Sequence, residues 1–279
     1  MIDLKHLGFD RVIAAHQTGE LIIDPGPPNT LETLLAALDG EPRAILLTHI
    51  HLDHAGATGA LVERYPGVKV YVHRIGAPHM IDPSKLWKSA SRIYADMEGT
   101  WGEPVPVPEA SIEILDGGET VEGMRVIHTP GHAGHHVTFF DEASGEAFTG
   151  DVAGVRVPPI DHVIAPTPPP EVDVDAWLRS IDAVADLGAE RLHLTHFGTV
   201  EDPAPQLEGT RESLLRNSAK VRELEHDDFM RWLDEDLEAA TDADTAERLR
   251  EAVPPEHIWL GLERYWRKRD ERESGAGDS

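Results

Sequence analysis

Residues 48–54, with the sequence THIHLDH, constrain this chain more than any other segment. An apolar run precedes them and a helical pattern follows, so the segment joins a strand to a helix. Side chains at i and i+2 of an extended segment point the same way, so His49 and His51 can bind one ion. The turn into the helix then directs Asp53 and His54 toward a second ion. Imidazole and carboxylate groups suit zinc, iron or manganese, and the spacing therefore predicts a metal site.

Three further candidate ligands come later in the chain, each where a strand-like run ends. They are His132 in the motif TPGH, Asp151 in TGD and His196 in THFG. A lone histidine at the end of a strand is usually structural. Here seven imidazole and carboxylate groups follow strand-like runs in four segments, each of which also contains Gly, Pro or Thr, and this repetition favours one shared site.

The rest of the chain predicts short strands alternating with helices, followed by helices alone. The expected strands are 11–15 and 20–23, which form a hairpin, and 44–47, 68–72, 112–115, 124–128, 137–140, 146–149 and 192–195. The expected helices are 31–38, 55–65, 85–98 and one that Asp173 caps and Gly188 ends. Six prolines within 158–170 exclude regular structure there. From Glu201 onward three or four amphipathic helices are expected, with a frayed end at 273–279.

The composition excludes several kinds of site and segment. The chain has 279 residues and no cysteine, which excludes disulfide bonds, thiolate catalysis and cysteine zinc ligands. The sequence has no run of about 18 apolar residues, so no membrane span and no membrane partner are expected. The N-terminus lacks the apolar segment of a secretory signal, and a cytoplasmic protein is therefore expected.

The chain is strongly acidic, with 51 Asp and Glu residues against 25 Lys and Arg residues and a net charge of −26. The acidic residues are spread along the whole chain, and only six of the basic residues are lysine. A uniformly acidic, lysine-poor surface predicts adaptation to high salt, and we hypothesise a halophilic source. Strong negative charge would normally argue against nucleic acid as a partner, but a surface adapted to salt makes the charge uninformative about the substrate.

The motifs HxHxDH, TPGH, TGD and THFG, in this order, resemble those of the metallo-β-lactamase superfamily over about residues 5–200. The resemblance implies an α/β (α+β) fold, a four-layer αββα sandwich with its site at one edge between two mixed sheets. Residues 1–200 would form this catalytic domain and residues 201–279 a helical C-terminal extension. The aromatic residues of the extension make a homodimer through the C-terminal helices an expectation.

The resemblance also implies how the ligands divide between two metal ions. The first ion would be bound by His49, His51 and His132, the second by Asp53, His54 and His196, and both by the bridging residue Asp151. The expected cofactors are two divalent ions, with zinc in the first place and iron or manganese as alternatives.

Two neighbouring divalent ions predict a hydrolase. Such a pair can hold a bridging hydroxide, because metal binding lowers the pKa of water from about 15.7 to about 7. Asp53 would orient this hydroxide and carry a proton to the leaving group. The motif series is similar to that of glyoxalase II (hydroxyacylglutathione hydrolase) and favours a small thioester or ester substrate. A lactone remains an alternative substrate, because lactonase relatives share the seven ligands.

Two other functions stay open. A phosphodiesterase or ribonuclease of the same fold would use the same two ions. Against it, the chain has no room for a long insertion between about residues 150 and 200 and no basic patch with interleaved aromatics. A non-catalytic metal-binding protein is the third alternative, but the complete set of ligands disfavours it.

Several residues outside the ligand set can support the site. Asp24, which follows the apolar run 20–23, can accept the N–H of a ligand histidine or simply form a turn. Five histidines can contact substrate, line the rim or sit on a flap, and the alternative for each is a structural role: His73, His79, His135, His136 and His162. Four others show no functional context: His6, His16, His226 and His257.

Overall fold

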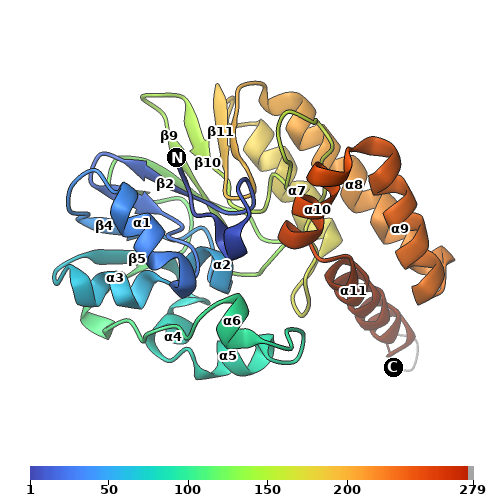
Figure 1. Ribbon diagram of the computed structural model, residues 1–279, viewed down its shortest axis with the longest axis horizontal. Coiled ribbons are helices and arrows are strands. Elements are labelled where there is room, and N and C mark those ends of the chain that lie inside the picture. Colours follow the sequence, from blue (N-terminus) through green and yellow to red (C-terminus); the bar gives the residue numbers. More distant parts are fainter. Residues whose placement is uncertain (276–279) are drawn as a thin grey trace.

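Two six-stranded sheets form the centre of the molecule (Figure 1), which is a computed structural model describing residues 1–275. The first sheet has the order β1-β2-β3-β4-β5-β6, with strands Ile2–Asp3, Ala14–Thr18, Leu21–Ile23, Ala44–Leu46, Lys69–His73 and Ile112–Leu115. The second has the order β12-β11-β10-β9-β8-β7, with strands Gly198–Val200, Arg191–Leu194, Glu146–Phe148, Val137–Asp141, Met124–His128 and Thr120–Val121. Both sheets are mixed, because β3 to β6 run parallel in the first and β10 runs parallel to β11 in the second.

Helices cover the outer face of each sheet. Those on the first sheet are α1 Leu31–Ala37, α2 Leu52–Ala55, α3 Thr58–Arg64, α4 Ala77–Ile81, α5 Ser84–Ala90 and α6 Met97–Thr100. Those on the second are α7 Val174–Ala185, α8 Pro203–Glu223, α9 His226–Ala240, α10 Ala243–Ala252 and α11 Pro255–Gly275. Short 3-10 turns lie at η1 His6–Gly8, η2 Pro28–Thr30 and η3 Glu109–Ser111. The layers confirm the predicted αββα sandwich.

The alternation of side chains along the strands explains this layering. Leu21 and Ile23 of β3 pack with Phe139 of β9 in a hydrophobic cluster between the sheets. Ile22, which lies between them in the sequence, packs in a second cluster with Leu34 of α1. Successive strand residues point to opposite faces of the sheet. One apolar strand therefore packs both against the other sheet and against the outer helices.

The four helices after residue 200 agree with the three or four expected. They share one hydrophobic cluster with the second sheet and α7, which includes Leu192, Trp177, Leu214, Phe229 and Leu262. The C-terminal helices therefore complete the outer layer of this sheet. A domain boundary at residue 200 and a homodimer through these helices stay predictions.

The expected single helix at 85–98 is wrong. Helix α5 ends at Ala90, and Asp96 caps α6 by accepting a hydrogen bond from the amide of Gly99 at 2.9 Å. Between the two helices Tyr94 packs edge-on against the rings of Trp101 and His257. This contact joins distant parts of the chain, so helical periodicity could not reveal it.

Three smaller differences concern element boundaries. The expected helix at 55–65 corresponds to α3, which begins only at Thr58, and the separate short helix α2 precedes it. The short strands β1, β7 and β12 were not predicted, because two or three residues show no periodicity. Part of the expected frayed end is helical, since α11 continues to Gly275. Its remaining residues, 276–279, lie outside the described part of the chain.

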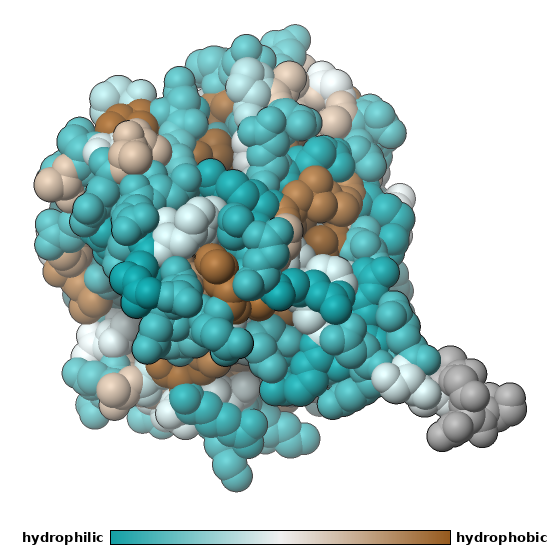
Figure 2. Space-filling view, turned by 90° about the vertical axis from the view of Figure 1, so that its right-hand side faces the viewer, coloured by the Kyte–Doolittle hydropathy of each residue, from teal (hydrophilic) through white to brown (hydrophobic). Residues whose placement is uncertain are grey.

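The proline-rich segment connects β10 to α7 without a helix or sheet strand among its described residues, as expected. An isolated bridge joins Val155 to Ile164 within it. Within residues 1–275, no helix combines the length and apolarity needed to cross a membrane. The face in Figure 2 is mostly hydrophilic, with small separate hydrophobic patches, as the acidic composition predicts.

Candidate metal centre

The predicted ligands lie together at one edge of the two sheets. Each follows the carboxyl end of a strand: His49, His51, Asp53 and His54 come after β4, His132 after β8, Asp151 after β10 and His196 after β11. Parallel strands end at the same edge of a sheet, and β10 and β11 are parallel. The fold therefore brings four separate segments to one point.

The first group consists of three histidines whose ring nitrogens converge. Nδ1 of His51 lies 3.0 Å from Nε2 of His49 and 2.9 Å from Nε2 of His132. His49 and His132 are buried, and His51 is partly exposed at the edge of the group. The i and i+2 spacing predicted that His49 and His51 would share one side, and the structure adds His132 from a distant loop.

The second group contains two histidines and a carboxylate. Oδ2 of Asp53 lies 3.3 Å from Nε2 of His196 and 3.8 Å from Nε2 of His54. Both histidines are buried, whereas the side chain of Asp53 is 21% exposed. Asp53 is therefore the member of this group that solvent or a substrate can reach.

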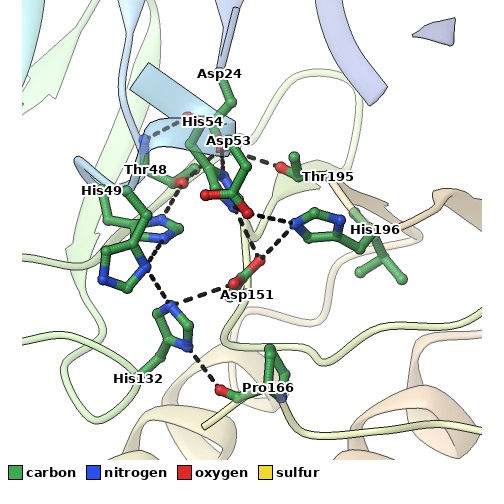
Figure 3. A network of polar contacts seen from close by, with 12 residues as sticks. Asp24, Thr48, His49, Asp53, His54, His132, Asp151, Pro166, Thr195 and His196 are labelled. Atoms are coloured by element: carbon green, nitrogen blue, oxygen red, sulfur yellow. Dashed lines mark hydrogen bonds and ion pairs between the residues drawn. The ribbon is translucent and has the colours of Figure 1, made fainter. Parts of the chain in front are cut away.

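Asp151 lies between the two groups (Figure 3). Its Oδ2 atom is 3.2 Å from Nε2 of His132, and its Oδ1 atom is 3.2 Å from Nε2 of His54 and 3.7 Å from Nε2 of His196. One carboxylate oxygen faces each group. This geometry is the one that a residue bridging two ions requires.

Hydrogen bonds on the outer side of the rings orient the histidines. Nδ1 of His132 donates to the carbonyl of Pro166 at 2.9 Å, and Nδ1 of His196 donates to the carbonyl of Val12 at 2.7 Å. A neutral imidazole that donates through Nδ1 keeps the lone pair of Nε2 for a ligand. Both Nε2 atoms face the interior of the cluster, as metal binding requires.

The structure confirms the contact that was predicted between Asp24 and one of the proposed ligand histidines, which is His54. Asp24 is fully buried, and its Oδ2 atom accepts hydrogen bonds from Nδ1 of His54 at 2.8 Å and from Oγ1 of Thr48 at 2.6 Å. Thr195 donates to the same oxygen at 3.1 Å, and the amide of Thr48 donates to Oδ1 at 2.8 Å. Asp24 thus ties the end of β3 to the segments after β4 and β11.

Burial and neighbouring charges shift the pKa values of the cluster in opposite directions. Burial lowers the pKa of His51 to about 3. Burial also acts against protonation of His54, but the carboxylates around it, Asp151 first, raise its pKa well above the usual range. In the described chain, the ion-pair partners of Asp151, Asp53 and Asp24 are all histidines. The buried carboxylates therefore create a strong demand for positive charge.

These observations fit divalent metal ions. Nε2 of His54 and Oδ1 of Asp151 are buried and have no hydrogen-bond partner. Buried polar atoms without partners cost free energy, and a cation between them would satisfy both atoms and supply the missing positive charge. Imidazole and carboxylate groups form the donor set that zinc, iron and manganese accept. The seven residues are therefore suited to the predicted role as ligands.

Three of the five histidines left open by the sequence lie close to the cluster. His79 and His135 line the cavity into which the cluster faces. His136 is fully buried behind the cluster, where its Nε2 atom accepts a hydrogen bond from the amide of Asp151 at 3.2 Å. His79 and His135 can thus contact a substrate, whereas His136 supports the loop that carries Asp151.

The other two do not line this cavity. His73 stacks on His128, with ring centroids 4.6 Å apart. His162 lies near the charged side chains of Asp236 and Arg216 on the C-terminal helices. It therefore does not form the flap over the metal centre that the sequence suggested. Its position follows from the path of the proline-rich segment, which carries Pro166 rather than His162 to the cluster.

A cavity of about 790 Å³ opens beside the cluster and contains residues that the sequence analysis missed. Tyr94, Trp101 and His257 line it together with His51 and Asp53. The expectation that His257 has no functional context is therefore wrong. No local pattern could have found it, because α11 reaches the cavity only through tertiary packing, as its place opposite α4–α6 in Figure 1 illustrates.

The chain is similar to known proteins in sequence and in fold. The model of the metallo-beta-lactamase superfamily matches residues 12–196, more than half of the chain and a span that contains all seven predicted ligands. The metallo-beta-lactamase fold-containing protein ST1585 of Sulfurisphaera tokodaii is 30% identical over 211 residues, which are 72% of this chain and 77% of that protein. The crystal structure of ST1585 has a TM-score of 0.70 at 25% identity and covers 94% of this chain and 96% of its own.

Two further similar proteins have names that indicate an activity or a bound metal. A hydroxyacylglutathione hydrolase of Aeromonas salmonicida is 32% identical over 140 residues, which are 49% of this chain and 43% of that enzyme. The structure of TTHA1623 in a di-iron-bound form has a TM-score of 0.53 at 28% identity and covers 71% of this chain and 92% of its own. The chain thus spans less than half of the hydroxyacylglutathione hydrolase.

Proposed function

Because this chain belongs to the metallo-β-lactamase superfamily, a family of metal-dependent hydrolases, we propose that it hydrolyses a small thioester, ester or lactone with two divalent metal ions. The observation that carries this proposal is the position of Asp151 between two groups of donor atoms. A site for a single ion would need only one of these groups of donor atoms. The presence of both groups supports a site for two ions.

In this proposal, His49, His51 and His132 hold one ion, Asp53, His54 and His196 hold the other, and Asp151 contacts both. When bound, the ions would lower the pKa of water toward about 7 and polarise the oxygen of the scissile bond. The chain itself supplies orientation, because outer hydrogen bonds hold the rings of His54, His132 and His196 each in one tautomer.

Asp53 has the second role that we propose. Its carboxylate lines the cavity and is the most exposed of the acidic groups in the cluster. Burial acts to raise the pKa of Asp53, but His54 and His196 hold it below its usual range, so the group is ionised at neutral pH. It can therefore accept a proton from the attacking water and deliver it to the leaving group.

The relatives support a class of substrate and a class of metal ion, but no single compound. The likeness to the hydroxyacylglutathione hydrolase of Aeromonas salmonicida favours a thioester. Zinc is the metal that we propose first, and iron is the alternative, which the di-iron form of TTHA1623 supports. The cavity of about 790 Å³ has the size of a small-molecule site.

Metal analysis and hydrolysis assays on the purified protein test this function. We expect two metal ions per chain and metal-dependent hydrolysis of a thioester or a lactone, with His51→Ala as the inactive control. Turnover of a bis-phosphodiester alone would replace the proposal with the phosphodiesterase alternative. Absence of bound metal after incubation with zinc, iron or manganese would overturn it.

A further inference from the structure

The inner wall of the cavity beside the metal centre is apolar. Ile50 and Leu52 are 2% and 5% exposed and come from the segment that also carries the ligands. Trp101 follows α6, and Val253 lies in the turn between α10 and α11. Four buried apolar side chains from three parts of the chain therefore meet beside the cluster.

Aliphatic side chains continue this surface toward solvent. Leu7 is 48% exposed and Ile75 is 50% exposed, and both line the cavity. Ile93, which is half-buried, lies on the same wall. These three residues belong to none of the hydrophobic clusters formed by the described residues. The stability of the fold does not account for them, and on so acidic a surface they offer apolar contacts to a ligand.

Three basic residues also line the cavity. Lys85 and Arg92 are exposed, and Arg264 is half-buried with its Nε atom donating to the carbonyl of Pro170 at 3.2 Å. Glu251 is half-buried, and burial raises the pKa of its carboxyl group. Glu251 already places one partly buried carboxylate in the lining of the cavity, so a second carboxylate beside it would meet a like charge.

We infer that the substrate carries an uncharged, apolar acyl group that fills the space between Ile50, Leu52, Ile93, Trp101 and Val253, beside the metal centre. This inference rests on the proposed hydrolase function and names the substrate class of the same site. Each methylene that leaves water on this wall should raise the apparent affinity about fourfold. A charged acyl group would lose this gain and would leave its carboxylate without a buried partner.

A series of thioesters of one small neutral thiol tests the inference. We expect kcat/KM to rise about fourfold per methylene from acetyl through butanoyl to hexanoyl. The adipoyl thioester has the same six-carbon chain as the hexanoyl thioester, with the terminal methyl group replaced by a carboxylate, and we expect its kcat/KM to be at least about tenfold lower. A flat series, or a preference for adipoyl, would overturn the inference.

Two matched variants locate the effect on the cavity wall. Ile93→Asn places a polar group on the wall without touching a hydrophobic cluster, and it should reduce the hexanoyl-to-acetyl ratio of kcat/KM about tenfold or more. Leu215→Asn makes the same kind of change at a 46% exposed position of α8 that does not line the cavity. It should leave the ratio unchanged. Equal ratios in both variants would contradict the assignment of the wall.

Calorimetric binding of acetate, hexanoate and adipate to the metal-loaded protein separates this inference from the proposed function. If no ester is cleaved but hexanoate binds at least about tenfold more tightly than acetate and adipate, the hydrolase proposal fails and the apolar site stands. If thioesters are cleaved but the three carboxylates bind equally, the hydrolase proposal stands and the apolar site is overturned.

Discussion

Asp24 and His54 form a fully buried pair in which Nδ1 of the histidine lies 2.8 Å from Oδ2 of the aspartate. The pair joins the end of β3 to the first turn of α2. Because Oδ2 accepts the outer proton of His54, the inner nitrogen of the ring faces Asp151. The stability of the fold and the orientation of a proposed metal ligand therefore depend on the same carboxylate.

Asp24→Asn should weaken both metal binding and folding. An amide has one acceptor oxygen, so it would leave either His54 or the amide of Thr48 facing its NH2 group. We expect metal affinity to fall about 10- to 100-fold and the free energy of unfolding to fall by about 2–4 kcal/mol. Chelator competition and urea unfolding measure the two effects. Asp161→Asn, which removes the same charge at an 88% exposed side chain, is the control and should change neither.

Gly261→Ala should disturb the contact between α11 and the segment that supports His132. A Cβ atom at residue 261 would lie 1.8 Å from the carbonyl oxygen of Thr167, and the neighbouring carbonyl of Pro166 accepts the hydrogen bond of His132. We expect a loss of about 1–3 kcal/mol in unfolding free energy, together with weaker metal binding. Gly275→Ala in the same helix meets no atom within 4 Å and serves as the control. Equal melting temperatures of the two variants would refute this packing argument.

Acidification should destabilise the protein through buried neutral histidines, and His16 offers a test outside the metal cluster. Burial lowers the pKa of His16 to about 3, whereas the unfolded chain titrates near its ordinary value of 6.5. Between pH 6.5 and 3 the unfolded state binds the extra proton, so the free energy of unfolding falls as the pH falls. The contribution of His16 reaches about 2 kcal/mol between pH 6.5 and pH 5.

His16→Gln removes this titration and keeps a donor for the carbonyl of Leu194, which lies 3.0 Å from the histidine ring. Urea unfolding at pH 7 and pH 5 should therefore show a smaller loss of stability in the variant than in the unaltered protein. An identical loss in both proteins would mean that His16 is not the group responsible.

High salt should stabilise the fold. A net charge of −26 creates repulsion across the surface, and potassium chloride screens it. Between 0.1 M and 2 M KCl we expect the melting temperature to rise by about 5 °C or more, which corresponds to about 2 kcal/mol. A melting temperature and an activity that do not respond to KCl would contradict the hypothesis of a halophilic source.

The sequence by itself determined the set of proposed ligands, and its motifs indicated the two-sheet architecture through their resemblance to a known family. Residues 48–54 carry four of the seven ligands within one strand-to-helix turn, and local geometry is enough to place them together. Asp24 was predictable for a similar reason, since it ends a short apolar strand. Local patterns indicated most strands and helices and the proline-rich break before α7, because these signals depend on neighbouring residues alone. The four layers followed from the resemblance of the motifs to the metallo-β-lactamase superfamily.

The tertiary structure alone decided what surrounds the cluster. Tyr94, Trp101 and His257 meet across more than 150 residues of sequence, and Tyr94 lies in the segment that separates α5 from α6, where periodicity predicted one helix at 85–98. The outer partners of His132 and His196 are backbone carbonyls, which carry no signature in the sequence. Local patterns specify which residues a strand end presents, whereas the shape of the cavity depends on how separate elements pack, and this packing is a property of the whole chain.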